Sequence, residues 1–133
     1  MRKNISTTVP STLKTFSAKG KFYVGVSDKL LVPWLKGKKY LNCSDEGEAI
    51  GIGAGYYLAT GKRANVFMSA DGFLNALNPL TSLVIPEKIK MNVIVSVGRK
   101  EPQHYLATKL VKPLTKLINA KPKGLTFTFI RAK

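Results

Sequence analysis

The sequence has 133 residues, a length that suits one domain with one core, and its hydrophobic content of 44% argues against wholesale disorder. Twenty-two Lys and Arg against seven Asp and Glu give a formal charge of +15, which permits an anionic partner but does not choose among nucleic acid, an acidic protein and an anionic substrate. The single cysteine excludes a disulfide within these residues, and one Cys with one His makes no zinc cluster.

The first part of the chain predicts two short strands around a helical turn. Lys21–Val26 (KFYVGV) is aromatic and β-branched, as in a strand, and Gly25 begins the turn that ends it. Asp28 has the position of a helix N-cap, because leucines and Trp34 follow it at helical spacing. Tyr40–Cys43 predicts a second strand, with the cysteine as a small buried apolar residue.

A glycine-rich helix follows. Ser44 is placed to cap it, and the pattern predicts that it runs through Ala49–Thr60 and stops at Gly61. Three of the chain's few acids fall in its first turns: Asp45, Glu46 and Glu48. Carboxylates favour a helix N-terminus, so a purely structural role stays open for all three. Four glycines in the same helix cost it stability, which indicates close packing against another backbone, at an interface or beneath a ligand: Gly47, Gly51, Gly53 and Gly55.

Strands and helices alternate through the rest of the chain. In order, the predicted elements are the strand Ala64–Met68, the helical segment Asn75–Leu83, the strand Met91–Val97, the helix Tyr105–Ile118 and the strand Leu125–Ile130. Leucines recur near one face of the segment Tyr105–Ile118, which indicates a helix, and Pro113 predicts a kink. The leucines are Leu106, Leu110, Leu114 and Leu117.

This alternation predicts an α/β fold, a three-layer sandwich with a mostly parallel central sheet. We expect the whole sequence, 1–133, to form one domain, with residues 1–10 disordered. Functional groups in such folds lie beyond the carboxyl ends of the strands. Four turns qualify: Gly25–Lys29, Ser44–Glu48, Ser69–Asn75 and Gly98–His104.

The longest uncharged apolar stretch, Ala49–Ala59, is shorter than the about 20 residues that a membrane-spanning helix needs. We therefore expect no membrane contact and a cytoplasmic protein.

Ser44–Lys62 (SDEGEAIGIGAGYYLATGK) closely resembles the glutamate-bearing helix in the pyrimidine-binding domain of thiamine-diphosphate enzymes. The wider match is to phosphonopyruvate decarboxylases and to the α subunit of sulfopyruvate decarboxylase. Three further blocks support the resemblance in the same order: Phe22–Leu31 (FYVGVSDKLL), Asn75–Leu83 (NALNPLTSL) and Glu101–His104 (EPQH). The resemblance implies the thiamine-diphosphate-binding fold, which is flavodoxin-like.

In that family the activating glutamate is followed three residues later by Ala, and nine and ten residues later by Gly-Tyr. Glu46 matches this pattern and Glu48 does not. The resemblance implies that Glu46 binds the pyrimidine ring nitrogen of thiamine diphosphate and is catalytic, and that Asn75 helps to bind the cofactor. It makes His104 a candidate for proton transfer or substrate contact, since an unperturbed His titrates near 6.5.

The substrate-facing turns contain the other candidates. We expect substrate binding by Asp28, Lys29, Arg99 and Lys100. These turns also depart from the family pattern: the segment that usually reads Asn-Ser-Gly reads Ala70-Asp71-Gly72 here. An anionic 2-oxo acid is the implied substrate, with sulfopyruvate slightly favoured over phosphonopyruvate.

The pyrophosphate half of these enzymes has a Gly-Asp-Gly start and an Asn-Asn end that hold magnesium and diphosphate. Ala70-Asp71-Gly72 is only superficially similar, because no Asn-Asn follows about 25–30 residues later. The resemblance therefore implies a partner subunit that holds Mg²⁺, in a hetero-oligomer that shares thiamine diphosphate; we expect no metal site on this chain.

Two other interpretations remain. The chain is alternatively a catalytically inactive pyrimidine-domain relative that binds an acidic partner through its basic surface. Residues 102–133 carry seven Lys or Arg and no acid, which suggests nucleic acid, but no stacking array of aromatic residues or base-reading motif accompanies them.

Overall fold

The computed structural model describes residues 20–119 and 124–131. The expectation of disorder at residues 1–10 falls outside these ranges. The described residues form a five-stranded parallel sheet in the order β2-β1-β3-β4-β5. The strands are β1 (Phe22–Gly25), β2 (Leu41–Asn42), β3 (Ala64–Ser69), β4 (Met91–Val97) and β5 (Leu125–Arg131). The predicted α/β fold is confirmed.

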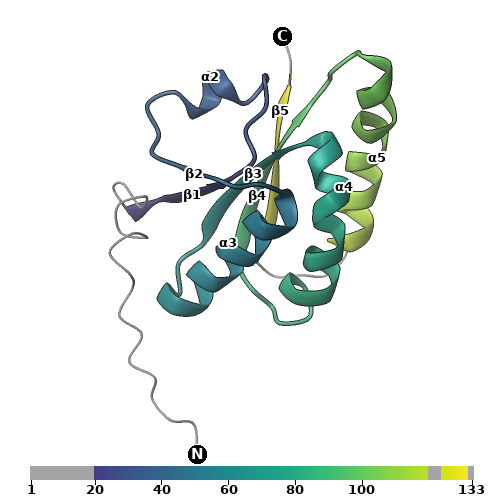
Figure 1. Ribbon diagram of the computed structural model, residues 1–133. Helices are drawn as coiled ribbons and strands as arrows, with labels where there is room; N and C mark the ends of the chain where they lie inside the picture. Colours follow the sequence, from purple (N-terminus) through teal and green to yellow (C-terminus); the bar gives the residue numbers. More distant parts are fainter. Residues whose placement is uncertain (1–19, 120–123, 132–133) are drawn as a thin grey trace, which may run out of the picture.

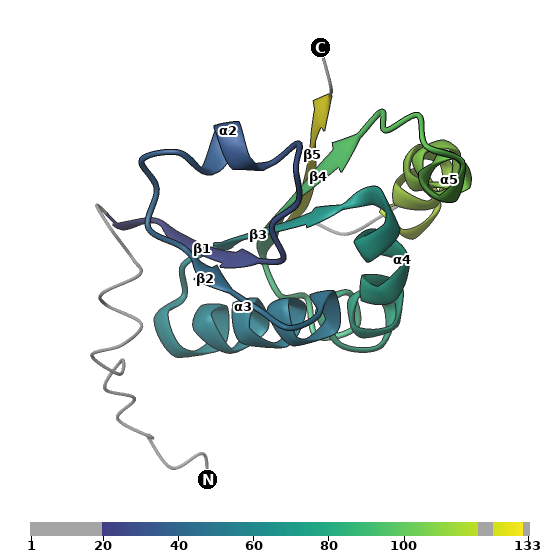
Figure 2. The ribbon, with the colours of Figure 1, turned by 45° about the horizontal axis from the view of Figure 1, so that its top comes forward.

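Helices cover the two faces of the sheet unequally (Figures 1 and 2). One face packs against three helices, α3 (Glu46–Thr60), α4 (Ala70–Pro79) and α5 (Pro102–Ile118). A π-helical turn, Leu80–Val84, continues α4. The other face carries the single-turn α2 (Val32–Leu35) and the loops around it.

Successive side chains of β3 contribute to two hydrophobic cores, one on each face of the sheet. Val66 and Met68 are fully buried beneath the three large helices, whereas Phe67 points to the opposite face and packs with Leu31 and Leu35 of the α2 segment. Because successive strand side chains point to opposite faces, a strand buried on both faces reads as an uninterrupted apolar run. This explains why β3 and β4 were recognisable in the sequence.

The sheet order reverses direction between β1 and β3. The chain proceeds from β1 outward to β2, then crosses back to β3 and continues to β4 and β5 on the other side. In parallel α/β sheets the crevice beyond the carboxyl ends of the strands at such a reversal is the usual ligand site. The loop that follows β1, and the starts of α3 after β2 and of α4 after β3, therefore form the candidate edge.

The starts of two helices differ from the prediction. Asp45, and not Ser44, caps α3, because the backbone N–H of Glu48 donates to Asp45 Oδ1 at 2.9 Å. Helix α4 begins at Ala70, five residues before the predicted Asn75, so the predicted turn Ser69–Asn75 is wrong. The Ser69 hydroxyl accepts from the Gly72 N–H at 3.1 Å and starts the helix immediately after β3.

The leucines that indicate the last helix do not mark its core side, because of the four only Leu114 packs against the core. Leu106, Leu110 and Leu117 are exposed, and the buried residues of α5 are Ala107, Val111 and Thr115. Small side chains face inward because α5 lies close to α4. The helix starts at Pro102, earlier than predicted, and continues through Pro113.

None of the helices within the described part of the chain is both long enough and apolar enough to span a bilayer.

Candidate functional site

Glu46 is the first residue of α3, and it is almost completely buried, with 9% of its surface exposed. Its side chain reaches from α3 to α4, where Asn75 Nδ2 donates a hydrogen bond to Glu46 Oε2 at 3.2 Å. Asn75 therefore lies on the helix and not in a turn, but it contacts the residue with which the sequence grouped it. A buried carboxylate is costly unless hydrogen-bond donors compensate it, and Asn75 supplies one.

Gly72 leaves the space that the Glu46 carboxyl group occupies. A Cβ at position 72 would lie 2.5 Å from Cδ and 2.6 Å from Cγ of Glu46, and closer still to Oε1. Any side chain at this position would displace the carboxylate. The first turn of α4 is thus shaped around Glu46, which distinguishes this carboxylate from an ordinary helix-terminal acid.

The neighbouring acids have structural partners at the surface. Asp45 caps α3, and the exposed Glu48 carboxylate accepts a hydrogen bond from the Ser44 hydroxyl. These contacts fit the helix-terminus interpretation for Asp45 and Glu48. Of the three clustered acids, Glu46 is the one that is buried and directed at another helix.

The glycines of α3 do not all serve close packing. A Cβ at Gly53 would meet Val66 Cγ2 at 2.7 Å, so this glycine lets α3 approach the sheet. No heavy atom outside the local helix lies within 4 Å of a Cβ built at Gly51 or Gly55, and both residues are exposed. Within the described chain, close packing of an α3 glycine on the sheet is found at Gly53, where the nearest atoms belong to side chains and not to another backbone.

Asp28 joins the loop after β1 to the end of β4. Its Oδ1 accepts from the backbone N–H groups of Leu30 and Leu31, each at 3.0 Å, and its Oδ2 accepts from Ser96 Oγ at 2.9 Å. The predicted helix N-cap is wrong, because the N-cap of α2 is Leu31, which makes no side-chain cap hydrogen bond; Asp28 caps the turn that precedes α2. Lys29 next to it is exposed. Three internal donors hold the Asp28 carboxylate in place, and a role in substrate binding stays a prediction.

His104 contacts Asp71, an acid that had no predicted role. The histidine is in the first turn of α5, and its Nδ1 forms a hydrogen bond with Oδ2 of Asp71 in the first turn of α4. The one sequence signal for Asp71 was its departure from the family pattern. Because Gly72 follows it directly, the same turn of α4 contacts both Glu46 and His104.

Arg99 forms a local ion pair. Its Nη2 donates to Glu101 Oε1 at 2.9 Å, and this hydrogen bond lowers the pKa of the exposed Glu101 carboxyl group to about 2. The same bond raises the pKa of Arg99 above its ordinary value. Lys100 between them is exposed. Part of the positive charge predicted for this turn is therefore offset by Glu101.

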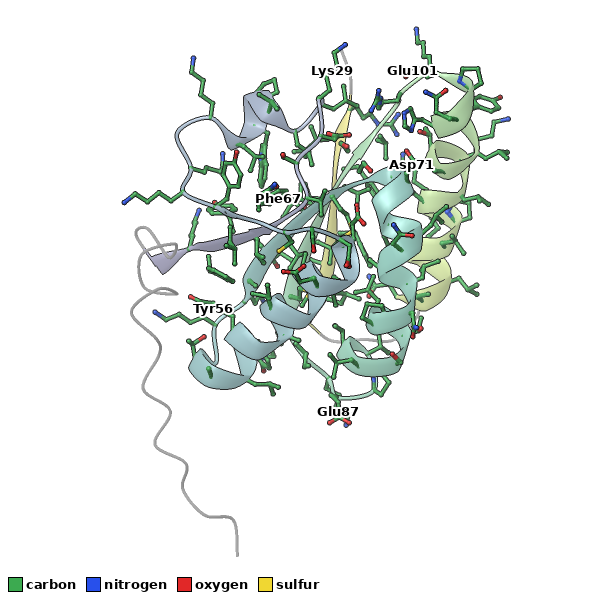
Figure 3. All side chains as sticks on the ribbon, in the orientation of Figure 1. Lys29, Tyr56, Phe67, Asp71, Glu87 and Glu101 are labelled. Atoms are coloured by element: carbon green, nitrogen blue, oxygen red, sulfur yellow. The ribbon has the colours of Figure 1, made fainter. Side chains whose placement is uncertain are left out.

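These groups lie at one edge of the molecule. Figure 3 shows Lys29, Asp71 and Glu101 toward the end at which the parallel strands finish, whereas Glu87 lies at the opposite end. The structure thus brings Glu46 into contact with Asn75, and His104 into contact with Asp71. Arg99 and Lys100 occupy the loop that leads from β4 to His104.

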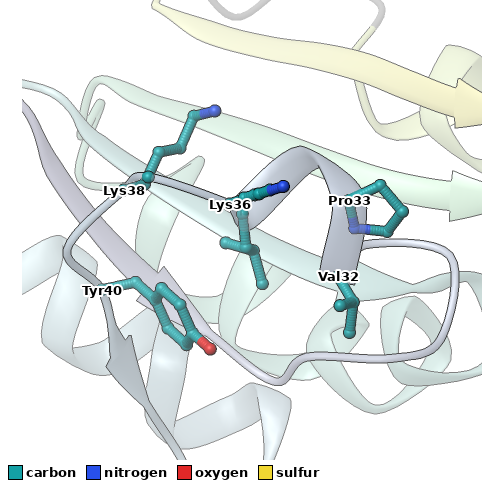
Figure 4. Close-up of a pocket in the computed structure, with 7 residues that line it drawn as sticks. Val32, Pro33, Lys36, Lys38 and Tyr40 are labelled. Carbon is teal, nitrogen blue, oxygen red and sulfur yellow. The ribbon is translucent and has the colours of Figure 1, made fainter.

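A separate surface groove of about 410 Å³ lies beside α2, on the other face of the sheet (Figure 4). It is lined by Val32, Pro33, Leu35, Lys36, Gly37, Lys38 and Tyr40. The Lys38 ammonium group lies 4.6 Å from the centre of the Trp34 ring, in cation–π geometry. No predicted site residue lines this groove.

No protein-family model matches the sequence. Two curated proteins are similar to part of it, both named phosphonopyruvate decarboxylase. The protein from Streptomyces viridochromogenes is 37% identical over 84 residues, which cover 59% of this chain and 21% of the relative. The protein from Streptomyces hygroscopicus is 35% identical over 82 residues, which cover 57% of this chain and 20% of the relative.

Part of this chain is related to part of a decarboxylase. The matched segments span about a fifth of the length of these curated relatives.

Proposed function

We propose that this chain is the pyrimidine-binding half of a thiamine-diphosphate-dependent decarboxylase. The observation that carries the proposal is the buried Glu46 carboxylate, which Asn75 orients and for which Gly72 leaves room. This arrangement occurs at the switch-point edge of a parallel sheet, in a chain that is similar to part of two phosphonopyruvate decarboxylases.

The residues at this edge fit the pyrimidine portion of the cofactor. Thiamine diphosphate, when bound, supplies the electron sink for loss of CO₂ from a 2-oxo acid. Glu46 is the group that shares a proton with the pyrimidine ring nitrogen, because a carboxylate with one oxygen bound to Asn75 keeps lone pairs for a second donor. Asn75 fixes the orientation of the carboxylate, and Gly72 keeps the space around it clear.

A complete cofactor site also requires a pyrophosphate half, which we propose is provided by a partner chain in a hetero-oligomer. That partner would hold Mg²⁺ and the diphosphate, since hard oxygen ligands suit this ion and the motif that provides them is absent from residues 1–133. On this proposal the isolated chain binds no thiamine diphosphate in a magnesium-dependent way, and adding the partner creates such binding. Tight, magnesium-dependent binding by the isolated chain in calorimetry would contradict the two-chain arrangement.

The proposed substrate is a 2-oxo acid with a second anionic group, such as sulfopyruvate or phosphonopyruvate. Lys29 and Lys100 are exposed at the proposed active edge, and Arg99 lies beside Lys100. A cationic entrance would raise the on-rate of an anionic substrate and hold its non-reacting group. Because Glu101 already pairs with Arg99, we expect Lys29 and Lys100 to contribute most of this attraction.

Steady-state kinetics of the assembled enzyme on sulfopyruvate, phosphonopyruvate and pyruvate test the proposal. We expect the enzyme to prefer sulfopyruvate and phosphonopyruvate, each of which has a second anionic group, over pyruvate. Lys100→Gln should raise KM for the anionic substrate more than for pyruvate. Lys62→Gln is the matched control, because Lys62 is an exposed lysine before β3, at the opposite end of the sheet.

Equal or better turnover of pyruvate would contradict the proposed substrate class. If the assembly forms normally but turns over none of the three 2-oxo acids, the alternative is favoured, in which the chain is an inactive pyrimidine domain that binds an acidic partner.

A further inference from the structure

Asp71 and His104 form a pair that neither the resemblance nor the related proteins assign. The two side chains come from the first turns of neighbouring helices, 33 residues apart in sequence, and they meet through Asp71 Oδ2 and His104 Nδ1. Both are partly shielded, with 38% of the Asp71 side chain and 21% of the His104 side chain exposed. Asp71 also stands next to Gly72, the residue that accommodates Glu46.

The carboxylate determines which ring nitrogen carries hydrogen. An ionised Asp only accepts hydrogen bonds, so Nδ1 must be the donor in this pair. A neutral His104 ring then has its hydrogen on Nδ1, and Nε2 has a free lone pair. When the ring takes up a proton, the added hydrogen is on Nε2, and Nε2–H becomes the donor to any ligand at the edge.

Other charged groups surround the pair without replacing it. Glu101 precedes α5, interacts electrostatically with His104 and binds Arg99. Arg99 in turn experiences the charges of Asp28 and Asp71. Of the acids in this group, Asp71 is the one whose carboxylate contacts the imidazole directly.

The proposed reaction needs a group that delivers a proton. Conversion of a 2-oxo acid to an aldehyde follows R–CO–COO⁻ + H⁺ → R–CHO + CO₂, so one proton is consumed in each turnover. An imidazolium Nε2–H can give this proton and regain one from solvent, while Nδ1–H stays bound to the Asp71 carboxylate. This step rests on the proposed function, whereas the contact between Asp71 and His104 does not.

We propose that Asp71 is a positioning residue, which fixes the tautomer and orientation of His104 so that Nε2 is the nitrogen that delivers the proton. A simpler role for the pair, a tie between α4 and α5, would affect stability and leave turnover unchanged. The two roles therefore differ in what a substitution of Asp71 changes.

The ring nitrogens can be observed directly because His104 is the only histidine in the sequence. We would record long-range ¹H–¹⁵N spectra of the uniformly ¹⁵N-labelled full chain, at a pH where the ring is neutral. The wild-type chain should show the Nδ1–H tautomer. Asp71→Ala should convert the ring to a mixture rich in Nε2–H, the form that free histidine favours. An Nε2–H tautomer in the wild-type chain, or an unchanged spectrum in Asp71→Ala, would overturn the proposal.

Kinetics of the assembled enzyme test the functional half. Asp71→Asn should lower kcat by about 10- to 100-fold with little change in KM, because correctly positioned acid–base groups contribute about 10²–10⁴-fold. Asp71→Glu, which keeps a carboxylate, should recover part of the loss. Glu101→Gln is the matched control for the spectra: it removes the same charge close to His104 but not the direct contact, and it should preserve the tautomer.

The outcomes separate this inference from the proposed function. Normal kcat in Asp71→Asn, in an enzyme that decarboxylates its substrate, overturns the positioning role and leaves the function intact. If the wild-type assembly decarboxylates no 2-oxo acid, the proposed function and proton delivery fail together.

Discussion

Replacing Gly72 by Ala tests whether α4 is shaped around Glu46. The new Cβ would lie 2.5 Å from Glu46 Cδ and 2.6 Å from Cγ, distances that carbon atoms do not tolerate. Because the carboxyl group is the far end of a flexible side chain, we expect it to swing away from α4. We do not expect α3 and α4 to separate. The swing breaks the hydrogen bond between Asn75 Nδ2 and Glu46 Oε2.

The expected stability change combines two opposing terms. Gly→Ala at a compatible helical position stabilises a protein by about 0.4–1 kcal/mol. Loss of a hydrogen bond to a charged group costs about 1.5–3 kcal/mol. Gly72→Ala should therefore lower the free energy of unfolding by roughly 0.5–2.5 kcal/mol, measured by urea denaturation. It should also lower the activity of the assembled enzyme at least about tenfold, since a misplaced catalytic group loses its alignment.

Gly55→Ala is the matched control. It is also a helical glycine, but no heavy atom outside the local helix lies within 4 Å of its built Cβ, so the substitution should stabilise the isolated chain by about 0.4–1 kcal/mol. If Gly72→Ala stabilised the chain as much as Gly55→Ala and preserved activity, the account of how Glu46 is held would be refuted.

Two further predictions concern the fold. Val111→Ala should cost about 1–3 kcal/mol in urea denaturation because Val111 is completely buried, whereas Leu117→Ala should change stability by less than about 0.5 kcal/mol because Leu117 is exposed. A larger loss for Leu117→Ala than for Val111→Ala would contradict this assignment of the core side of α5. Burial, aided by the charge of Glu48, raises the pKa of the Cys43 thiol to about 11 from its ordinary value of 9.0. The stability that this thiol contributes is therefore fully present below pH 9.0 and is lost as the pH rises toward 11. Cys43→Ala should therefore lose less stability than the wild type across that interval, and equal losses in the two proteins would contradict the shift.

The strands could be predicted from the sequence because their burial leaves a direct pattern. A strand covered on both faces has no polar positions to interrupt it, and the predicted bounds of Met91–Val97 match β4 residue for residue. The end of α3 at Gly61 was equally clear, since this glycine has a positive φ of 71° and ends the helix. Both features depend on local sequence alone.

The errors in the predicted elements arose where packing between helices, and not local sequence, determines the structure. Ala70-Asp71-Gly72 reads as a turn, yet the Ser69 hydroxyl caps it and the space around Glu46 requires the glycine. The core face of α5 could not be predicted from its leucines, because the close approach of α4 favours small residues there, such as Ala107.

The candidate site was predicted in part. The resemblance grouped Glu46 and Asn75, and the structure adds their contact and the role of Gly72. The pairing of Asp71 with His104 could not be predicted, because it depends on how the first turns of two helices meet in space. Local periodicity holds no information about such a contact.

The most direct test of the central claim is the rate of C2 proton exchange of thiamine diphosphate bound to the assembled enzyme. Glu46→Gln keeps the size of the side chain and its contact with Asn75 but removes the carboxylate, so we expect normal folding and assembly with exchange reduced to the rate of the free cofactor. Glu48→Gln, which alters an exposed acid bonded to Ser44, should exchange at the wild-type rate. Near-normal exchange in Glu46→Gln would contradict the assignment of Glu46 as the activating carboxylate.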